Sequence, residues 1–369
     1  MLKTMGFPSR YMQGPGALEQ AGQLLGELGF SRPALLCDDT VHKVALPGLL
    51  QSLDAAGHDS GVIRFPGEIN LETVSDCNHR IGQHRPDVVL GLGGGKTVDA
   101  AKAAAANLGI PVVIAPTVAS NDAPTSRLIV INDTSSKPAR IDFLTLNPMA
   151  VLVDTRIIVA APPRFFAAGI GDAISKSLEA RQCAASGGVN FFGTPPSATA
   201  VMLADQCYQI ILRHATGAFD SVCRQDITAE VEDLVEATVL LSGLGFENGG
   251  LSLAHALIRG ITSIPATSRN LHGEMVAFGA LVQTVVEGRS QQEIDQLLTV
   301  LVHVGLPTTF ADLGYEGVIS EADLDRMIAP TLAHTYAANM RPALTRDALR
   351  SGLLKTNELG TAFGLGQPA

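Results

Sequence analysis

Short apolar runs alternate with stretches of helical periodicity in the N-terminal part of the chain. The runs predict buried strands, because they lack the apolar–polar alternation of a strand with one exposed face; they are residues 34–38, 60–65, 87–93 and 111–116. Residues 41–56, 71–84 and 97–107 carry helical spacing between them. Strands that alternate with helices imply crossover connections, so the sequence predicts a mostly parallel sheet covered by helices.

The pattern changes along the rest of the chain. Residues 127–133 and 150–155 predict two more strands, but strand signals nearly vanish after Pro162 and Pro163. Helical spacing then recurs at residues 172–183, 198–215, 228–244, 251–259, 274–288, 291–305 and 320–330. A chain of 369 residues has room for about two domains. We therefore predict an α/β domain over residues 1–162 and an all-α domain over residues 163–369.

Charge and composition exclude several classes of partner. The chain has 36 acidic and 26 basic residues, a net charge of −10, and no cluster of Lys or Arg. We therefore expect no nucleic-acid partner and no binding to an anionic membrane surface. No apolar run reaches the length of a membrane span, and the start lacks a secretory signal pattern. Five widely spaced cysteines without a CxxC pair favour a reducing, cytoplasmic location.

A glycine-rich turn, GLGGGKTVD at residues 91–99, joins a predicted strand to a predicted helix. Glycine lets backbone amides approach a pyrophosphate, and the N-terminus of a helix carries a partial positive charge. The spacing is neither GxGxxG nor that of a P-loop, and a turn that only caps a helix would look the same. Asp38, at the end of the first predicted strand, is likewise compatible with two roles. Its carboxylate suits the ribose hydroxyls of NAD, or the N-cap of the next helix.

One acid and two histidines are candidate metal ligands. Asp172 lies at a predicted helix start, His255 in an apolar helical stretch, and His272 where another helix begins. A carboxylate and two imidazoles form a three-ligand site with an open position, which suits catalytic Zn²⁺ or Fe²⁺. Spacing alone does not bring them together, since Asp172 also suits an N-cap and His255 a helical core.

Several motifs carry a resemblance to a known family. In order along the chain they are GLGGGKTVDAAKAAA, PTVASNDAPTS, NPMAVLVDTRII, GIGDAISKSLEA, LSLAHAL and LHGEMVAFG. Over residues 10–360 the chain resembles the glycerol dehydrogenases of the iron-containing (type III) alcohol dehydrogenase superfamily. The resemblance implies a dinucleotide-binding α/β domain, a helical domain, an active site in the cleft between them, and a homo-oligomer.

The resemblance also assigns individual residues. The metal ligands it implies are Asp172, His255 and His272. The residues it places at the nicotinamide cofactor are Gly94, Gly95 and Lys96 at the pyrophosphate, Thr117, Ser120, Ser126 and Leu128 along the nicotinamide part, and Asp38 at the adenosine ribose. Asp122 falls on the acid that contacts the polyol substrate.

The chain departs from the family pattern at a few positions. Lys176 stands where many iron-type relatives have a histidine four residues after the metal aspartate, which matches a three-ligand, zinc-using branch. Asn132 replaces a tyrosine near the nicotinamide, and Ile258-Arg259 replaces a His-Asn pair. Arg127 stands where a small residue is usual. If Arg127 or Arg259 faces the active site, a planar cation favours a carboxylate or phosphate; otherwise both face solvent or pair with a surface acid.

These observations predict a metal-dependent oxidoreductase that transfers a hydride between NAD and a small polyol such as glycerol. A 2-hydroxy acid dehydrogenase of the same family is one alternative, favoured by the two arginines. A dehydroquinate-synthase-like lyase is another, although such enzymes carry more basic residues for phosphate. A catalytically silent dinucleotide-binding protein is the non-enzymatic alternative, and the retained Asp172, His255 and His272 argue against it.

Overall fold

The computed structural model describes residues 2–133 and 138–365, which fold as two compact units. The first, here called the sheet unit, contains residues 6–162 with residues 225–227. The second, the helical unit, contains the N-terminal residues up to Met5 and the rest of the chain from Pro163 onward. The predicted fold class, an α/β part followed by an all-α part, is confirmed.

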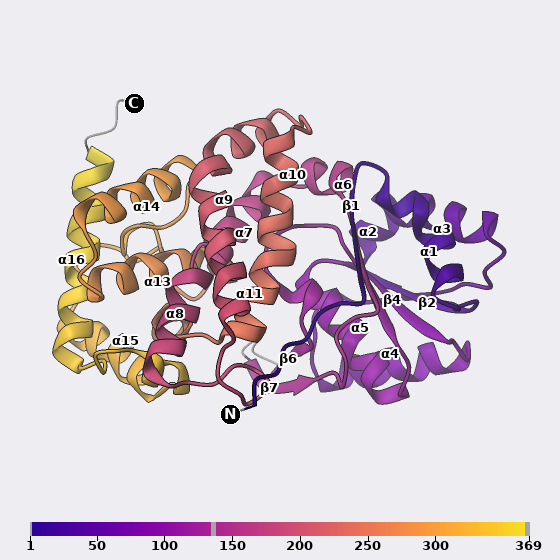
Figure 1. Cartoon of the computed structure of the whole chain (residues 1–369), viewed down its shortest axis with the longest axis horizontal. Helices are drawn as coiled ribbons and strands as arrows, with labels where there is room; N and C mark the ends of the chain where they lie inside the picture. The colour runs from indigo at the N-terminus through magenta and orange to yellow at the C-terminus, as the bar shows by residue number, and fades with distance from the viewer. Residues whose placement is uncertain (1, 134–137, 366–369) are drawn as a thin grey trace. The chain divides into compact units, whose positions relative to one another are not determined.

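A parallel sheet forms the centre of the sheet unit (Figure 1). Its strands are β1 (Arg10–Gly14), β2 (Pro33–Cys37), β3 (Gly61–Arg64), β4 (Val88–Gly93), β5 (Val112–Pro116) and β8 (Ala150–Asp154). They lie in the order β1-β8-β5-β4-β2-β3, and each neighbouring pair is parallel. The strands β2, β4, β5 and β8 are buried along their whole length, as expected of parallel strands covered on both faces.

Helices cover both faces of this sheet. Helices α4 and α5 share one apolar core with one face, and α1 and α3 share another core with the opposite face (Figure 1). The helices of the unit are η1 (Ala17–Gln20), α1 (Ala21–Glu27), α2 (Asp39–Val44), α3 (Leu46–Ala55), α4 (Leu71–Gln83), α5 (Gly95–Leu108), η2 (Ala123–Thr125) and α6 (Thr155–Ala160). An antiparallel pair of strands, β6 (Leu128–Asn132) and β7 (Pro138–Phe143), completes the unit.

The strand order reverses between β2 and β4. The chain runs from β2 outward to β3 and then returns past β2 to β4, which also pairs with β5. In open α/β sheets, ligands bind beyond the carboxyl ends of the strands at such a reversal. Asp38 follows β2 directly, and Gly94 and Gly95 follow β4. The fold therefore brings these loops, far apart in sequence, to adjacent strand ends.

The helical unit contains a bundle of helices around its own apolar core (Figure 1). They are α7 (Pro163–Ala173), α8 (Lys176–Ser186), α9 (Ala198–Cys223), α10 (Ala229–Val235), η3 (Glu236–Leu241), α11 (Ser242–Gly249), α12 (Leu253–Ile261), α13 (His272–Val286), α14 (Gln291–His303), α15 (Glu321–Ala333), η4 (Thr335–Asn339) and α16 (Arg346–Leu365). Side chains of α12, α13, α15 and α16 form one continuous core that includes Leu257, Phe278, Met327 and Leu353.

Some predicted elements differ from those observed. Residues 172–183 predict one helix, but α7 already begins at Pro163, and the chain turns at Ile174 and Ser175 before α8. Residues 228–244 predict one helix, whereas the structure has α10, a turn of π-helix and α11 in succession. Strand β1 has no counterpart in the prediction, because an edge strand that is only partly buried carries polar residues.

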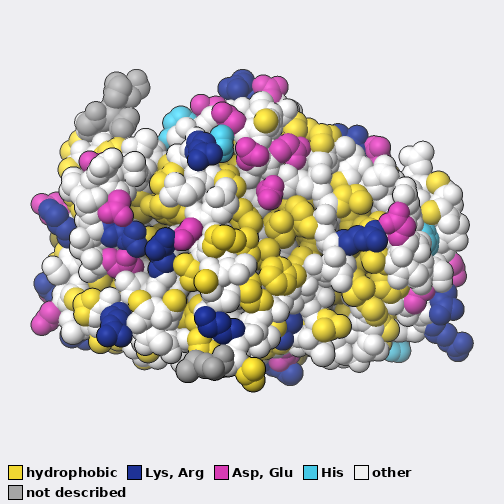
Figure 2. Space-filling view, viewed as in Figure 1, with side chains coloured by type: hydrophobic (Ala, Val, Ile, Leu, Met, Phe, Trp, Pro, Cys, Tyr) yellow, Lys and Arg dark blue, Asp and Glu magenta, His cyan; other side chains and the backbone are white. Residues whose placement is uncertain are grey.

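The surface carries mixed charge. On the face drawn in Figure 2, Lys and Arg side chains are interspersed with Asp and Glu side chains. Among the residues that the structure describes, no helix is both long and apolar enough to cross a membrane.

Candidate metal centre and dinucleotide-binding loops

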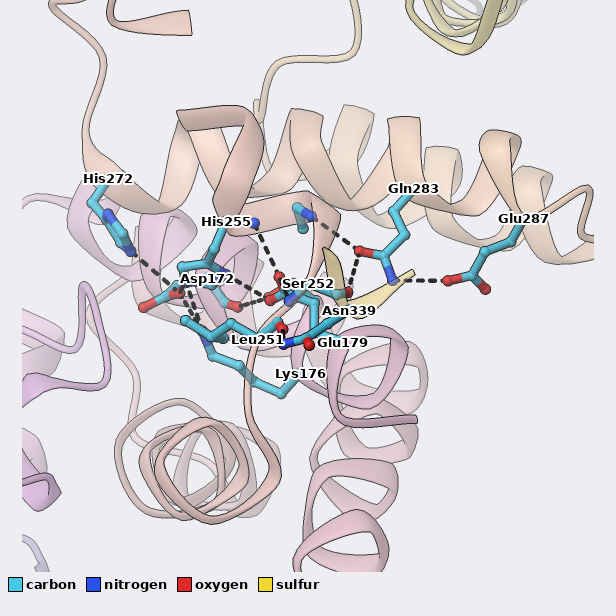
Figure 3. Close-up of polar contacts among 12 residues, drawn as sticks. Asp172, Lys176, Glu179, Leu251, Ser252, His255, His272, Gln283, Glu287 and Asn339 are labelled. Carbon is cyan, nitrogen blue, oxygen red and sulfur yellow. Dashed lines mark hydrogen bonds and ion pairs between the residues drawn. The ribbon is translucent and has the colours of Figure 1, made fainter. Parts of the chain in front are cut away.

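Three side chains from separate helices converge in the helical unit (Figure 3). Asp172 lies near the end of α7, His255 in the first turn of α12, and His272 is the first residue of α13. The Nε2 atoms of His255 and His272 lie 3.4 and 3.7 Å from Asp172 Oδ1. One potential ligand atom from each residue lies within 4.8 Å of the other two. The structure therefore brings together the three residues predicted to hold a metal ion.

Two glycines let α7 and α13 approach closely enough for this convergence. A Cβ atom on Gly171 would lie 2.4 Å from the carbonyl oxygen of Gly273, and one on Gly273 would lie 1.7 Å from that of Ala168. Neither position can carry a larger side chain without moving the backbone. The glycines flank the site directly, since Gly171 precedes Asp172 and Gly273 follows His272.

Glu179 fixes the orientation of His255. Its Oε2 lies 2.6 Å from His255 Nδ1, and its Oε1 accepts hydrogen bonds from the backbone N–H groups of Ser252 and His255 at 2.9 and 3.0 Å. The ring therefore carries a proton on Nδ1 and directs Nε2 toward Asp172 (Figure 3). Burial by itself raises the pKa of Glu179, but the neighbouring His255 and Lys176 lower it overall, so the carboxylate stays ionised.

A second acid, Glu274, holds the helix turn that carries His272. Glu274 accepts a hydrogen bond from the backbone N–H of Leu271 at 2.7 Å, which caps the start of α13. Arg164 on α7 binds the same carboxylate in a bidentate manner at 2.6 and 2.8 Å. The pair ties the helix that carries Asp172 to the first turn that carries His272. The His272 side chain remains 45% exposed.

Lys176 lies next to the three converging side chains. Its Nζ donates to Asp172 Oδ1 at 2.6 Å and lies 3.3 Å from His255 Nε2, and the Lys176 and Asp172 side chains are fully buried. Burial by itself raises the pKa of Asp172, but Lys176, His272 and His255 outweigh it and hold this pKa well below its ordinary value. Asp172 is thus a carboxylate, as a metal ligand must be.

The donor set is chemically suited to a divalent transition metal. One carboxylate oxygen and two imidazole nitrogens form the protein part of three-ligand Zn²⁺ sites and of non-haem Fe²⁺ sites. Both types of site leave a coordination position for a substrate oxygen. Sequence reasoning did not find Glu179, because neither spacing nor composition indicates which acid hydrogen-bonds a distant imidazole. It also missed Glu274, although an acid three residues after the start of a helix is the spacing of a capping residue.

The glycine loop has the form expected of a phosphate-binding turn. Gly94 is the N-cap of α5, and a Cβ on Gly95 would lie 2.6 Å from the Asn121 side chain. Lys96 is exposed and pairs with Glu68. Asp38 caps α2, because its Oδ1 accepts from the backbone N–H groups of Thr40 and Val41, both at 2.9 Å. Asp38 is therefore the N-cap of α2, and the capping uses only its Oδ1 atom.

The residues predicted along the nicotinamide lie in the segment that follows β5, and the last of them, Leu128, is the first residue of β6. Thr117 and Ser126 are buried, whereas Ser120, Asp122 and Leu128 are partly exposed. Buried Lys102 on α5 organises this segment: its Nζ donates to the carbonyl oxygens of Ala123 and Leu128 at 2.5 and 2.9 Å. Lys102 was not predicted, although a lysine within an alanine-rich buried helix was a visible signal.

The two unusual arginines have different surroundings. The Arg127 guanidinium lies over the Phe143 ring, 5.7 Å from its centroid. Arg259 is exposed on α12, one helical turn after His255. Asn132 ends β6 and forms an isolated bridge with Asn70.

Known proteins resemble this chain in sequence and fold. The family profile described as iron-containing alcohol dehydrogenase matches residues 8–155. The glycerol dehydrogenase of Thermotoga maritima is 41% identical over 322 residues, 87% of each chain. The glycerol dehydrogenase of Pseudomonas putida is 37% identical over 96% of this chain and 97% of its own. The crystal structure of glycerol dehydrogenase from Schizosaccharomyces pombe aligns with a TM-score of 0.92 at 31% identity, covering 100% of this chain and 94% of that one.

Proposed function

The chain belongs to the iron-containing alcohol dehydrogenase family, and on this basis we propose that it transfers a hydride between NAD and a small polyol such as glycerol. The observation that carries the proposal is the convergence of Asp172, His255 and His272, whose potential ligand atoms lie within 4.8 Å of one another. The relatives named as glycerol dehydrogenases support the substrate class.

Asp172, His255 and His272 would hold the metal ion. When bound, such an ion supplies the Lewis acidity that lowers the pKa of an alcohol hydroxyl. Glu179 keeps the Nε2 lone pair of His255 directed at the site, and Glu274 with Arg164 holds the first turn of α13 that carries His272. We favour Zn²⁺ over Fe²⁺, because Lys176 occupies the place where many iron-type relatives have a fourth ligand.

The sheet unit would bind NAD. The amide groups at Gly94 and Gly95, at the start of α5, suit the pyrophosphate, with Lys96 beside them. Thr117, Ser120, Ser126 and Leu128 would line the nicotinamide part, and Asp122 would orient a hydroxyl of the substrate. Asp38 favours NAD over NADP, because a carboxylate beside the ribose repels a 2′-phosphate. The hydride transfer itself is the chemistry of the nicotinamide.

The proposal extends to the assembly and the location of the protein. We propose a homo-oligomer, as the resemblance implies. All five cysteines are free, and four of them are buried. Free thiols are stable in a reducing compartment, which supports the proposed cytoplasmic location.

A substrate panel tests the function. The metal-loaded protein is mixed with NAD or NADP and with glycerol, 1,2-propanediol or a 2-hydroxy acid, and the reduced cofactor is followed by its absorbance. We expect net NADH with glycerol and 1,2-propanediol, no comparable rate with NADP, and loss of the rate on chelation. A dehydroquinate-synthase-like lyase would accumulate no NADH. A silent binding protein would bind the cofactor and reduce none with any alcohol, and either result would contradict the proposal.

A further inference from the structure

One face of helix α12 is less buried than the other, and Arg259 is exposed on it. Its opposite face is buried at Leu253, Leu257 and Ile261, and close packing at Gly260 leaves no room there for a side chain, since a Cβ would lie 2.3 Å from the Met327 carbonyl oxygen. The residues that are not buried are His255, Ile258, Arg259 and Thr262. Their spacing of three and four residues places them on a single face of the helix.

Arg259 therefore shares a face with the proposed metal ligand His255. Residues four apart on a helix have Cβ atoms roughly 5–6 Å apart. The Arg259 side chain therefore begins one helical turn after that of His255. Among the residues that the structure describes, no carboxylate pairs with its guanidinium. Other exposed arginines of this unit do pair, as Arg326 does with Asp323 at 3.1 Å and Arg350 with Glu321 at 2.6 Å.

His334 supplies a second donor, because it is the N-cap of η4, which packs against α12. Its Nδ1 accepts a hydrogen bond from the backbone N–H of Tyr336 at 3.3 Å, and its ring lies edge-on to Tyr336, with centroids 4.5 Å apart. Since Nδ1 is an acceptor, the neutral imidazole carries its proton on Nε2. Burial lowers the pKa of His334, and the Arg259 guanidinium lowers it further.

We propose that Arg259, with His334 as a second donor, forms an anion subsite beside the metal centre, which selects alcohols that carry a carboxylate or phosphate group. The inference rests on the proposed function, since it concerns the substrate of the same site. A guanidinium presents parallel N–H groups that match two oxygens of either anion, and its charge is permanent. A neutral triol has no group that uses this charge. The chain would therefore accept 2-hydroxy acids or phosphorylated polyols more readily than a protein with a neutral side chain at this position.

A purely structural role for Arg259 predicts a different outcome. A basic residue in the last turn of a helix also interacts favourably with the helix dipole. Loss of that interaction would change the stability of α12 and affect all substrates alike. The discriminating quantity is therefore the ratio of kcat/KM for an anionic alcohol to kcat/KM for glycerol.

The test compares Arg259→Gln and Arg259→Lys with the natural protein. Arg213→Gln is the matched control, because Arg213 is also exposed on a helix of this unit and its removal changes the charge equally. Glycerol, lactate and glycerol 3-phosphate are assayed with NAD at constant ionic strength. Calorimetry measures binding of lactate and glycerol 3-phosphate to each metal-loaded protein, so that binding is known even where turnover is slow.

We expect Arg259→Gln to lower the ratio, and to weaken binding of the anion, by about ten- to a hundredfold, as for loss of a charge-assisted hydrogen bond. Arg259→Lys should recover part of the loss, and Arg213→Gln should behave as the natural protein. The affected anion, lactate or glycerol 3-phosphate, identifies the group that is recognised. The inference is overturned if neither anion binds, or if the ratio and both affinities are the same in all four proteins. If Arg259→Gln loses anion binding but no protein forms NADH from any alcohol, the subsite stands and the proposed function fails.

Discussion

Replacing Glu179 with glutamine preserves the shape of the side chain but leaves it unable to accept all three of its hydrogen bonds. Oε1 accepts from two backbone N–H groups, and Oε2 accepts from His255 Nδ1. If the amide group of glutamine faces the backbone, it meets two other donors. If it faces His255, it donates to Nδ1, and the ring proton moves to Nε2, the atom that must bind the metal.

Both orientations cost free energy at the metal site. A buried donor left without an acceptor costs about 1–3 kcal/mol. Replacement of an acid that orients a metal-binding histidine typically lowers metal affinity about ten- to a hundredfold, which corresponds to roughly 1.4–2.7 kcal/mol. We expect Glu179→Gln to fall in this range, because Glu179 and His255 Nδ1 are only 2.6 Å apart and the carboxylate is fully buried.

Competition with a chelator of known affinity measures the metal affinity of each protein. Glu321→Gln is the control, because Glu321 lies on the surface and pairs only with an exposed arginine. Glu179→Gln should bind metal more weakly, and excess metal should restore much of its turnover. If the variant binds Zn²⁺ within twofold of the natural protein, Glu179 does not set the tautomer of His255 and the argument fails.

Three further substitutions test other parts of the structure. Lys176→His places an imidazole one turn after Asp172 and should raise the affinity for Fe²⁺ relative to Zn²⁺, whereas Lys176→Met should not. Equal ratios of affinity in the two variants would show that a side chain at this position cannot supply a fourth ligand. Lys102→Met leaves the Ala123 and Leu128 carbonyl groups without the Lys102 donor and should raise the KM for NAD about tenfold. Lys355→Met, at the surface, should leave the KM unchanged. An unchanged KM in Lys102→Met would show that Lys102 does not organise the cofactor-binding segment. Burial raises the pKa of Asp99 to about 6, against the opposing effect of Lys102. The protonated side chain therefore contributes to the free energy of unfolding below pH 4, and this contribution is lost as the pH rises through 6. The loss is about 3 kcal/mol relative to Asp99→Asn. Denaturant unfolding at a series of pH values measures this difference, and parallel curves for the two proteins would contradict it.

The strands of the sheet were largely predictable, because parallel strands buried on both faces are continuous apolar runs between glycines and prolines. Residues 87–93 and 111–116 correspond to β4 and β5 nearly residue for residue. Helix starts were harder, since the residues after Pro163 in α7 form a nearly continuous run of apolar and small residues that shows no helical spacing. The edge strand β1 was not predicted, because its partial exposure permits the polar residues Arg10 and Gln13.

The convergence at the metal centre is a property of packing. No spacing links Asp172 to His255 or His272; the contact depends on how α7, α12 and α13 pack, through Gly171 and Gly273. The resemblance predicted which residues meet. It could not predict that Lys176 lies against them, since a lysine in place of a histidine indicates only that a ligand is missing. The partner of Arg127, the Phe143 ring, likewise became visible only in the folded chain.

Titration of the metal-free protein with Zn²⁺ measures whether turnover depends on an ion held by Asp172, His255 and His272. The rate of NADH formation from glycerol is measured as Zn²⁺ is added, for the natural protein and for His255→Ala, with circular dichroism to establish that the variant is folded. The account predicts a rate that rises to a plateau at one ion per chain in the natural protein, and no rate in the folded variant. Full turnover without metal, or a folded His255→Ala protein that binds one ion and turns over normally, would contradict it.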